Sequence, residues 1–156
     1  MINEFPIKIE EMLIAAGWTR DRSVDICSIK DYLESKRFIL HPAVTPVIQS
    51  LDGLRIVSST GRWLTFDARA AAQMRNSSKI ELLQPLVRCL LCPLGQLSCG
   101  EFYGADDGKI YGLDQDWILI NRGKNICEFF NGILLGDPSA LETIWLSDDQ
   151  RPENMG

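Results

Sequence analysis

The stretch that decides the fold is FYGADDGKIYGLDQDWILI, residues 102–120. Short apolar segments alternate in it with two aspartate-containing turns, and Asp106-Asp107-Gly108 is typical of a β-hairpin turn. Consecutive short strands joined by tight turns pair in antiparallel fashion. The expected strands are Phe102–Ala105, Lys109–Leu113 and, after residues 114–116, Trp117–Ile120.

Further secondary-structure signals precede these three expected strands. Asp67 is a suitable N-cap for an alanine-rich helix that reaches Met74. Residues 75–79 are polar and are expected to form a loop, whereas the apolar run Val87–Leu94 is expected to be a central strand. Two more strands are expected on either side of a turn at Ser58–Gly61, namely Leu54–Val57 and Trp63–Phe66.

Apolar residues at helical spacing mark both ends of the chain. Helices are expected from about residue 7 to Gly17, over Val24–Lys36, after His41-Pro42 as far as Asp52-Gly53, and over Lys124–Leu135. Leu141–Leu146 fits a short helix or a strand. Helices and strands in separate runs predict an α+β fold, with a central, mostly antiparallel sheet flanked by N-terminal helices and a closing C-terminal helix. One domain is expected over residues 1–146, with a polar, disordered tail over 147–156.

The length and the net charge of the chain limit the classes of function that it can have. The chain has 156 residues, of which 46% are hydrophobic, so it can bury a core without a metal or a disulfide. The net charge is −5, and Lys and Arg are scattered and outnumbered by Asp and Glu. Nucleic-acid binders usually carry a basic face. We therefore expect no nucleic-acid partner, and the acidic balance favours a basic protein partner.

The cysteines and the apolar segments indicate the cellular compartment of the protein. The five cysteines are an odd number, and no charged-then-apolar signal segment opens the chain, which indicates a reduced, cytoplasmic protein. No apolar run approaches the ~20 residues that cross a bilayer, so no membrane partner is expected.

Candidate catalytic residues are few. His41 is the only histidine, and its place at an expected helix start, where an imidazole often makes a local hydrogen bond, favours a structural role. Cys89 and Cys92 form a C-x-x-C pair, but a second pair of ligands at zinc-site spacing is missing. Within one extended strand the two side chains would point to opposite faces and could not chelate together. Buried free thiols are the favoured interpretation.

The acidic turns raise a calcium hypothesis. A calcium loop starting at Asp114 would need Glu at its twelfth position, where Asn125 stands, and Gly at its sixth, where Leu119 stands. Solvated hairpin turns are favoured instead. Glycine-rich phosphate-binding motifs are absent from the sequence. Neither a metal nor a cofactor is expected, and the chain is predicted not to be an enzyme.

Several short landmarks follow one another in a specific order. They are Ala16-Gly17-Trp18, Arg22-Ser23-Val24, His41-Pro42-Ala43, Asp52-Gly53-Leu54, Phe66-Asp67, Cys92-Pro93-Leu94-Gly95, Asp107–Tyr111 and Phe129–Gly136. This succession, over about Phe5–Gly136, resembles the SUKH-3 group of the SMI1/KNR4-like (SUKH) superfamily. The aspartate-rich turn and the C-x-x-C pair depart from the pattern.

The resemblance implies an α+β domain without catalytic residues. For bacterial members it implies an immunity protein of a polymorphic toxin system, which binds a cognate toxin domain, often a nuclease or a deaminase, and blocks its active site. A non-catalytic scaffold or regulatory domain of the SMI1/KNR4 type is the alternative. Stoichiometric zinc in purified protein would instead favour an enzyme that uses Cys89, Cys92 or His41.

The acidic residues supply a candidate binding surface. Nucleases bind polyanions through basic sites, so an inhibitor can present carboxylates to those cationic side chains. The candidate partner-binding residues are the acids expected to be exposed near the hairpin turns: Glu101, Asp106, Asp107, Asp114 and Asp116. The protein itself is expected to be a monomer or a weak dimer.

Overall fold

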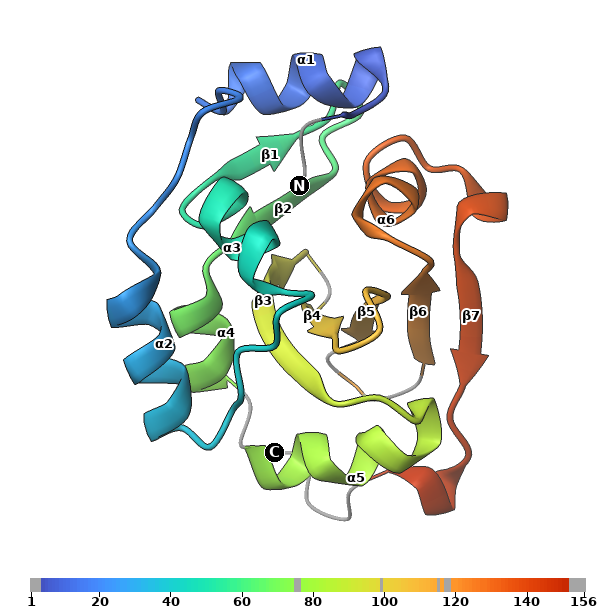
Figure 1. The fold of residues 1–156 in the computed structure, drawn as a ribbon. Coiled ribbons are helices and arrows are strands. Elements are labelled where there is room, and N and C mark those ends of the chain that lie inside the picture. The colour runs from blue at the N-terminus through green and yellow to red at the C-terminus, as the bar shows by residue number, and fades with distance from the viewer. Residues whose placement is uncertain (1–3, 75–76, 99, 115, 117–118, 152–156) are drawn as a thin grey trace.

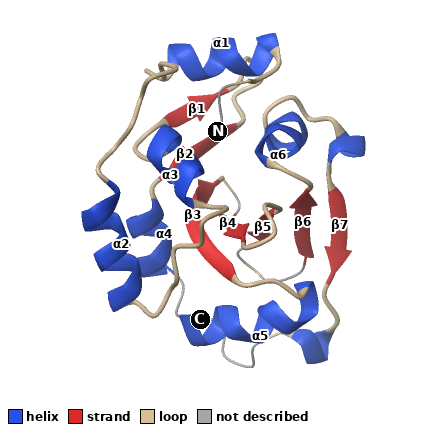
Figure 2. Cartoon of the chain, in the orientation of Figure 1, coloured by secondary structure: helices blue, strands red, loops and turns tan. Residues whose placement is uncertain are grey.

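The chain forms a seven-stranded sheet with helices packed on both sides (Figures 1 and 2). The structure is a computed structural model and describes residues 4–74, 77–98, 100–114, 116 and 119–151. Three helices come first, two more lie between the second and third strands, and another follows the sixth strand. The predicted α+β class is confirmed.

The sheet is a continuous meander. Each strand pairs with the next one in the sequence, and every pairing is antiparallel. The strands are β1 (Arg55–Val57), β2 (Trp63–Phe66), β3 (Leu91–Leu97), β4 (Gly100–Ala105), β5 (Ile110–Asp114), β6 (Leu119–Gly123) and β7 (Glu142–Trp145). β3 and β4 lie at its centre and are buried along almost their whole length.

The helices begin and end at residues that local chemistry favours. Asp25 and Asn125 cap α2 and α6 by accepting hydrogen bonds from backbone N–H groups, and Asp67 accepts one from Ala70. Gly17, which follows α1, has φ +103°, a conformation that favours glycine. The helices are α1 (Ile7–Ala15), α2 (Ile26–Ser35), α3 (Thr45–Leu51), α4 (Ala68–Met74), α5 (Ser77–Val87) and α6 (Ile126–Ile133), with 3₁₀ turns η1 (Pro138–Ala140) and η2 (Asp148–Gln150).

One hydrophobic core joins buried residues of the sheet with buried residues of all six helices. Helices α3 and α6 cover one side of the central strands, and α5 lies on the other side (Figure 1). The Phe102 ring of β4 packs 5.0 Å from the Phe66 ring and 5.5 Å from the Phe129 ring of α6. All three side chains are fully buried, which stabilises the fold by about 2 kcal/mol for each ring.

The region between residues 75 and 97 differs from the sequence prediction. Residues 77–79, expected in a loop, begin α5, and Val87, expected in a strand, ends it. Ile80, Leu83 and Val87 are buried at helical spacing, so burial of this face outweighs Pro85 inside the helix. The strand itself is β3, which begins at Leu91. Residues 75 and 76 lie outside the described residues.

The other predicted elements are found close to their expected bounds. The β4–β5 hairpin is confirmed, and Leu141–Leu146, which was compatible with either element, contains strand β7. The strand expected over Trp117–Ile120 corresponds to β6, which extends to Gly123, while residues 117 and 118 lie outside the description. In the expected tail, Asp148–Gln150 form η2, and residues 152–156 are not described. No helix in the described part of the chain is long and apolar enough to span a bilayer.

Candidate partner-binding surface

Four of the five candidate acids are divided between the two ends of β5. The register pairs Gly104 of β4 with Ile110 and Gly100 with Asp114. The turn 106–108 therefore lies at one end of the β4–β5 ladder, and Asp114 lies at the other. Four residue steps of ~3.4 Å separate these ends by about 14 Å. The expected acidic surface therefore consists of two separate acidic turns.

The first acidic turn, Asp106–Gly108, is held by local hydrogen bonds. Gly108 adopts φ +89° and donates a backbone hydrogen bond to the carbonyl of Ala105 at 3.0 Å. The Asp107 carboxylate accepts from the Lys109 backbone N–H at 3.1 Å and lies 3.2 Å from the Lys109 ammonium. Asp106 and Asp107 are both exposed, as predicted from the sequence.

Hydrogen bonds also connect this turn to the loop between α5 and β3. The Cys89 thiol donates a hydrogen bond to the Asp107 carboxylate at 3.2 Å. The Leu90 N–H donates to the Asp106 carboxylate at 3.2 Å, and the Asp106 N–H donates to the Leu90 carbonyl at 3.1 Å. Arg88, with φ +58°, directly follows α5 and is the first residue of this loop. Residues distant in sequence are therefore held together at one end of the central strands.

Electrostatics keep Asp107 ionised and Cys89 protonated. Partial burial raises the pKa of Asp107, but hydrogen bonds from Lys109 and from the Cys89 thiol outweigh this effect, so the pKa is lowered. Burial is the largest cause of the raised pKa of the Cys89 thiol, and the adjacent Asp107 carboxylate raises it further. At neutral pH the turn presents a carboxylate, and the thiol lacks the thiolate character that a nucleophile needs.

The second acidic turn follows β5. Asp114 is partly buried and accepts a hydrogen bond from the Asp116 N–H at 2.9 Å, while Asp116 is exposed. Residues 115, 117 and 118 lie outside the description, so the structure fixes only these two acids of the turn.

Glu101 does not belong to either exposed turn, and the prediction that its side chain is exposed is wrong. It is the second residue of β4 and is 0% exposed. Its backbone pairs with Gln96 of β3 and Leu113 of β5, so it occupies a central position in the sheet. A glutamate in such a strand cannot meet a partner at the surface without a rearrangement of the sheet.

The two cysteines of the C-x-x-C pair do not share a strand, contrary to the sequence prediction. Cys92 lies in β3, where burial raises its pKa to about 12, whereas Cys89 lies in the preceding loop. Sequence reasoning missed a different grouping: the Cys89 sulfur and one oxygen each of Asp106 and Asp107 lie within 4.8 Å of one another. These are possible metal-ion ligands, although the Lys109 ammonium already contacts Asp107.

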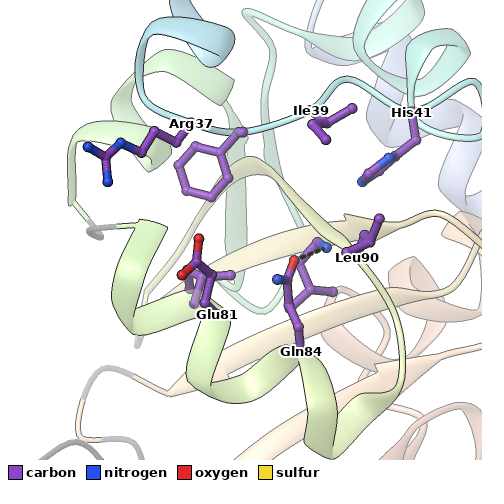
Figure 3. Close-up of a pocket in the computed structure, with 9 residues that line it drawn as sticks. Arg37, Ile39, His41, Glu81, Gln84 and Leu90 are labelled. Atoms are coloured by element: carbon purple, nitrogen blue, oxygen red, sulfur yellow. Dashed lines mark hydrogen bonds between the residues drawn. The ribbon is translucent and has the colours of Figure 1, made fainter.

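A pocket beside this loop was not predicted from the sequence. It has a volume of about 180 Å³ and lies between residues 37–41, α5 and the start of β3. Figure 3 shows His41 projecting from one wall, with Glu81 and Gln84 of α5 on the opposite wall. Gln84 is held in place because its carboxamide oxygen accepts a hydrogen bond from the Leu91 N–H at 2.9 Å.

His41 takes part in local structure through its backbone. Its carbonyl accepts hydrogen bonds from the N–H groups of Val44 and Thr45, each at 3.0 Å. Its side chain is 5% exposed, and Nε2 is buried with no hydrogen-bond partner among the described residues. The expected structural role is therefore met by the backbone, and Nε2 of the imidazole makes no hydrogen bond within the described part of the chain.

Comparison with known proteins identifies a family but no individual relative. No curated protein and no solved structure matches the chain. The family model described as SUKH-3 immunity protein matches residues 5–136, which run from the segment before α1 to just past the end of α6. Because this match covers most of the chain and agrees with the observed α+β fold, the chain belongs to the SUKH-3 immunity protein family.

Proposed function

We propose that this protein is the cytoplasmic immunity protein of a polymorphic toxin system. It binds the cognate toxin domain, a nuclease or a deaminase, and neutralises that domain by covering its active site. Membership of the SUKH-3 immunity family carries the proposal. The protein acts through binding alone and as a monomer or weak dimer, without catalysis.

The proposed contact centres on the first acidic turn, Asp106 and Asp107. Both side chains are exposed, and the lowered pKa of Asp107 keeps its carboxylate charged in neutral solution. The bonds from Leu90 and Cys89 hold the turn in place before a partner arrives, so little ordering entropy is lost on binding. A basic substrate-binding site of a nuclease is the complementary surface.

The second acidic turn, with Asp114 and Asp116, is proposed as a separate contact. Its distance of about 14 Å from the first turn is within the span of a standard interface of ~800 Å² per partner. A single partner can therefore cover both turns, but each turn makes its own contribution. Glu101 is left out of the proposed contact because it is buried.

Co-expression with the toxin gene encoded beside this one tests the proposal. Wild-type protein should restore growth and co-purify with the toxin domain. Asp106→Asn/Asp107→Asn should weaken toxin affinity by about tenfold or more, because two charge pairs are lost while asparagine still fits the turn. Asp114→Asn/Asp116→Asn measures the second turn separately.

A matched control removes the same charge elsewhere. Glu11→Gln/Asp31→Asn neutralises two exposed acids of α1 and α2 and should leave toxin affinity unchanged. If wild-type protein neither binds nor protects, the proposed function is wrong. If it binds but growth is not restored, the scaffold alternative is favoured.

A further inference from the structure

We propose that the pocket beside the α5–β3 loop receives a tyrosine side chain of the protein partner. The ring occupies the apolar interior, and its hydroxyl group bonds to Nε2 of His41. The assignment of the ring to a toxin rests on the proposed function, whereas the recognition of a phenol by the pocket does not.

The size and the walls of the pocket fit one aromatic ring. Its volume is about 180 Å³, and an apolar protein cavity of ~150 Å³ holds benzene. Phe38, Ile80 and Leu91 line it and are each 5% exposed or less, so they supply a fixed apolar interior. The pocket is already present in the unbound chain, and only the side chains that cover the buried Nε2 of His41 must shift for a hydroxyl group to reach that atom.

His41 requires a polar group on that ring. A buried polar atom without a hydrogen bond is costly, and Nε2 has no partner among the described residues. A phenol hydroxyl can donate to or accept from an imidazole nitrogen, so it satisfies either tautomer. A phenylalanine ring would leave Nε2 without a partner. Arg37 and Glu81 line the pocket with opposite charges, so the lining gives an anion no advantage over a neutral ring.

The rim of the pocket indicates that the ring comes from a protein. Ile39 and Leu90 line it and are 63% and 46% exposed, which offers apolar contact beyond the size of a free phenol. Leu90 also lines the adjoining hollow that reaches Asp106. The pocket and the first acidic turn are thus neighbours, and one partner can place an aromatic anchor and basic side chains on them together.

Because His41 is the only histidine, its imidazole resonance identifies the pocket without ambiguity. The first experiment titrates the full chain with p-cresol, the tyrosine side-chain analogue, and separately with toluene. We expect saturable shifts of the His41 imidazole signal with p-cresol and about fivefold weaker binding of toluene, which lacks the hydrogen bond. His41→Leu should retain the fold and bind both probes equally.

Three results would overturn the phenol assignment. Equal affinity of wild type for p-cresol and toluene would make the pocket purely apolar. A saturable shift with inorganic phosphate but not with p-cresol would make it an anion site. The absence of a saturable shift with any probe would mean that the pocket binds no ligand of this kind. Because these titrations use wild-type protein, they remain decisive even if His41→Leu fails to fold.

The second experiment tests the source of the ring with the cognate toxin. Ile39→Ala on the rim should weaken toxin binding by about tenfold. The matched control is Ile7→Ala on α1, which removes an isoleucine that is 75% exposed and should leave binding unchanged. Figure 1 shows α1 and α5 at opposite ends of the molecule.

The outcomes of the two experiments separate the two proposals. Equal toxin affinity of Ile39→Ala and wild type would overturn the assignment of the ring to the toxin and leave the neutralising function intact. If wild-type protein binds no toxin, that assignment fails together with the proposed function, and the p-cresol titration still decides what the pocket recognises.

Discussion

Leu90 and Asp106 exchange two hydrogen bonds, one from the Leu90 N–H to the Asp106 carboxylate and one from the Asp106 N–H to the Leu90 carbonyl. Leu90 lies on the rim of the His41 pocket, and Asp106 lies in the first acidic turn. This pair of bonds therefore fixes the apolar and the charged parts of the proposed surface relative to each other.

Removal of the Asp106 carboxylate should loosen this link locally. In Asp106→Ala, the Leu90 amide loses its acceptor, which costs about 1 kcal/mol of local stability and raises its hydrogen-exchange rate by about fivefold. The neighbouring Leu91 amide donates to Gln84 and is the internal control, so its rate should not change. Equal acceleration of both amides would mean that the whole loop opens and would contradict the specific link.

Cys89 should become more reactive when Asp107 loses its charge. The Asp107 carboxylate contributes to the raised pKa of the thiol, so Asp107→Asn should lower that pKa and increase the alkylation rate at constant pH. The measurement is iodoacetamide labelling followed by peptide mass spectrometry. Cys27 is exposed and lies in α2, and its rate should stay the same. An unchanged Cys89 rate would show that Asp107 does not control the thiol.

Asp107 should also make stability depend on pH in the acid range. Its pKa is lower in the folded protein, so its contribution is fully present above the unfolded value of about 3.9 and disappears as the pH falls through the folded value. Asp107→Asn lacks this contribution at every pH. The difference in unfolding free energy between wild type and variant should therefore shrink below about pH 4. A difference that is constant between pH 3 and pH 7, as measured by urea unfolding, would contradict the lowered pKa.

Gly95 should tolerate no side chain. It lies at a bulge of β3, where a Cβ atom would collide with the Thr65 carbonyl oxygen and come within 2.9 Å of the Phe102 ring. Gly95→Ala should destabilise the fold by about 3 kcal/mol. Gly112→Ala in β5 is the matched control, because its nearest neighbour is a Leu97 methyl group at 3.2 Å, and it should cost about 1 kcal/mol. Similar melting temperatures for the two variants would argue against the close approach at Gly95.

Local sequence signals predicted most of the fold. The turn residues Asp106–Gly108 and the N-cap Asp67 act within a few positions of themselves, so their effects can be inferred without the tertiary structure. α5 was missed because its buried residues Ile80, Leu83 and Val87 run directly into an apolar loop and strand. Pro85 and the adjacent apolar run together obscured the helical period.

The candidate surface was less predictable because exposure depends on tertiary packing. Glu101 and Asp106 are both acids beside a hairpin, yet one lies in the buried centre of the sheet and the other at its exposed end. The His41 pocket combines residues 37–41 with residues 80–91, which lie far from them in the sequence, and no spacing rule links the two segments. The link between Cys89 and Asp107 likewise arises only when the α5–β3 loop meets the β4–β5 turn.

Titration of the purified cognate toxin domain with this protein tests neutralisation most directly. The measurement follows toxin activity and complex formation in the same samples. Activity should fall linearly to the background at one equivalent, and excess toxin substrate should slow complex formation, because both ligands compete for the active site. A stable complex that retains full toxin activity, or the absence of any complex, would contradict the proposed neutralisation.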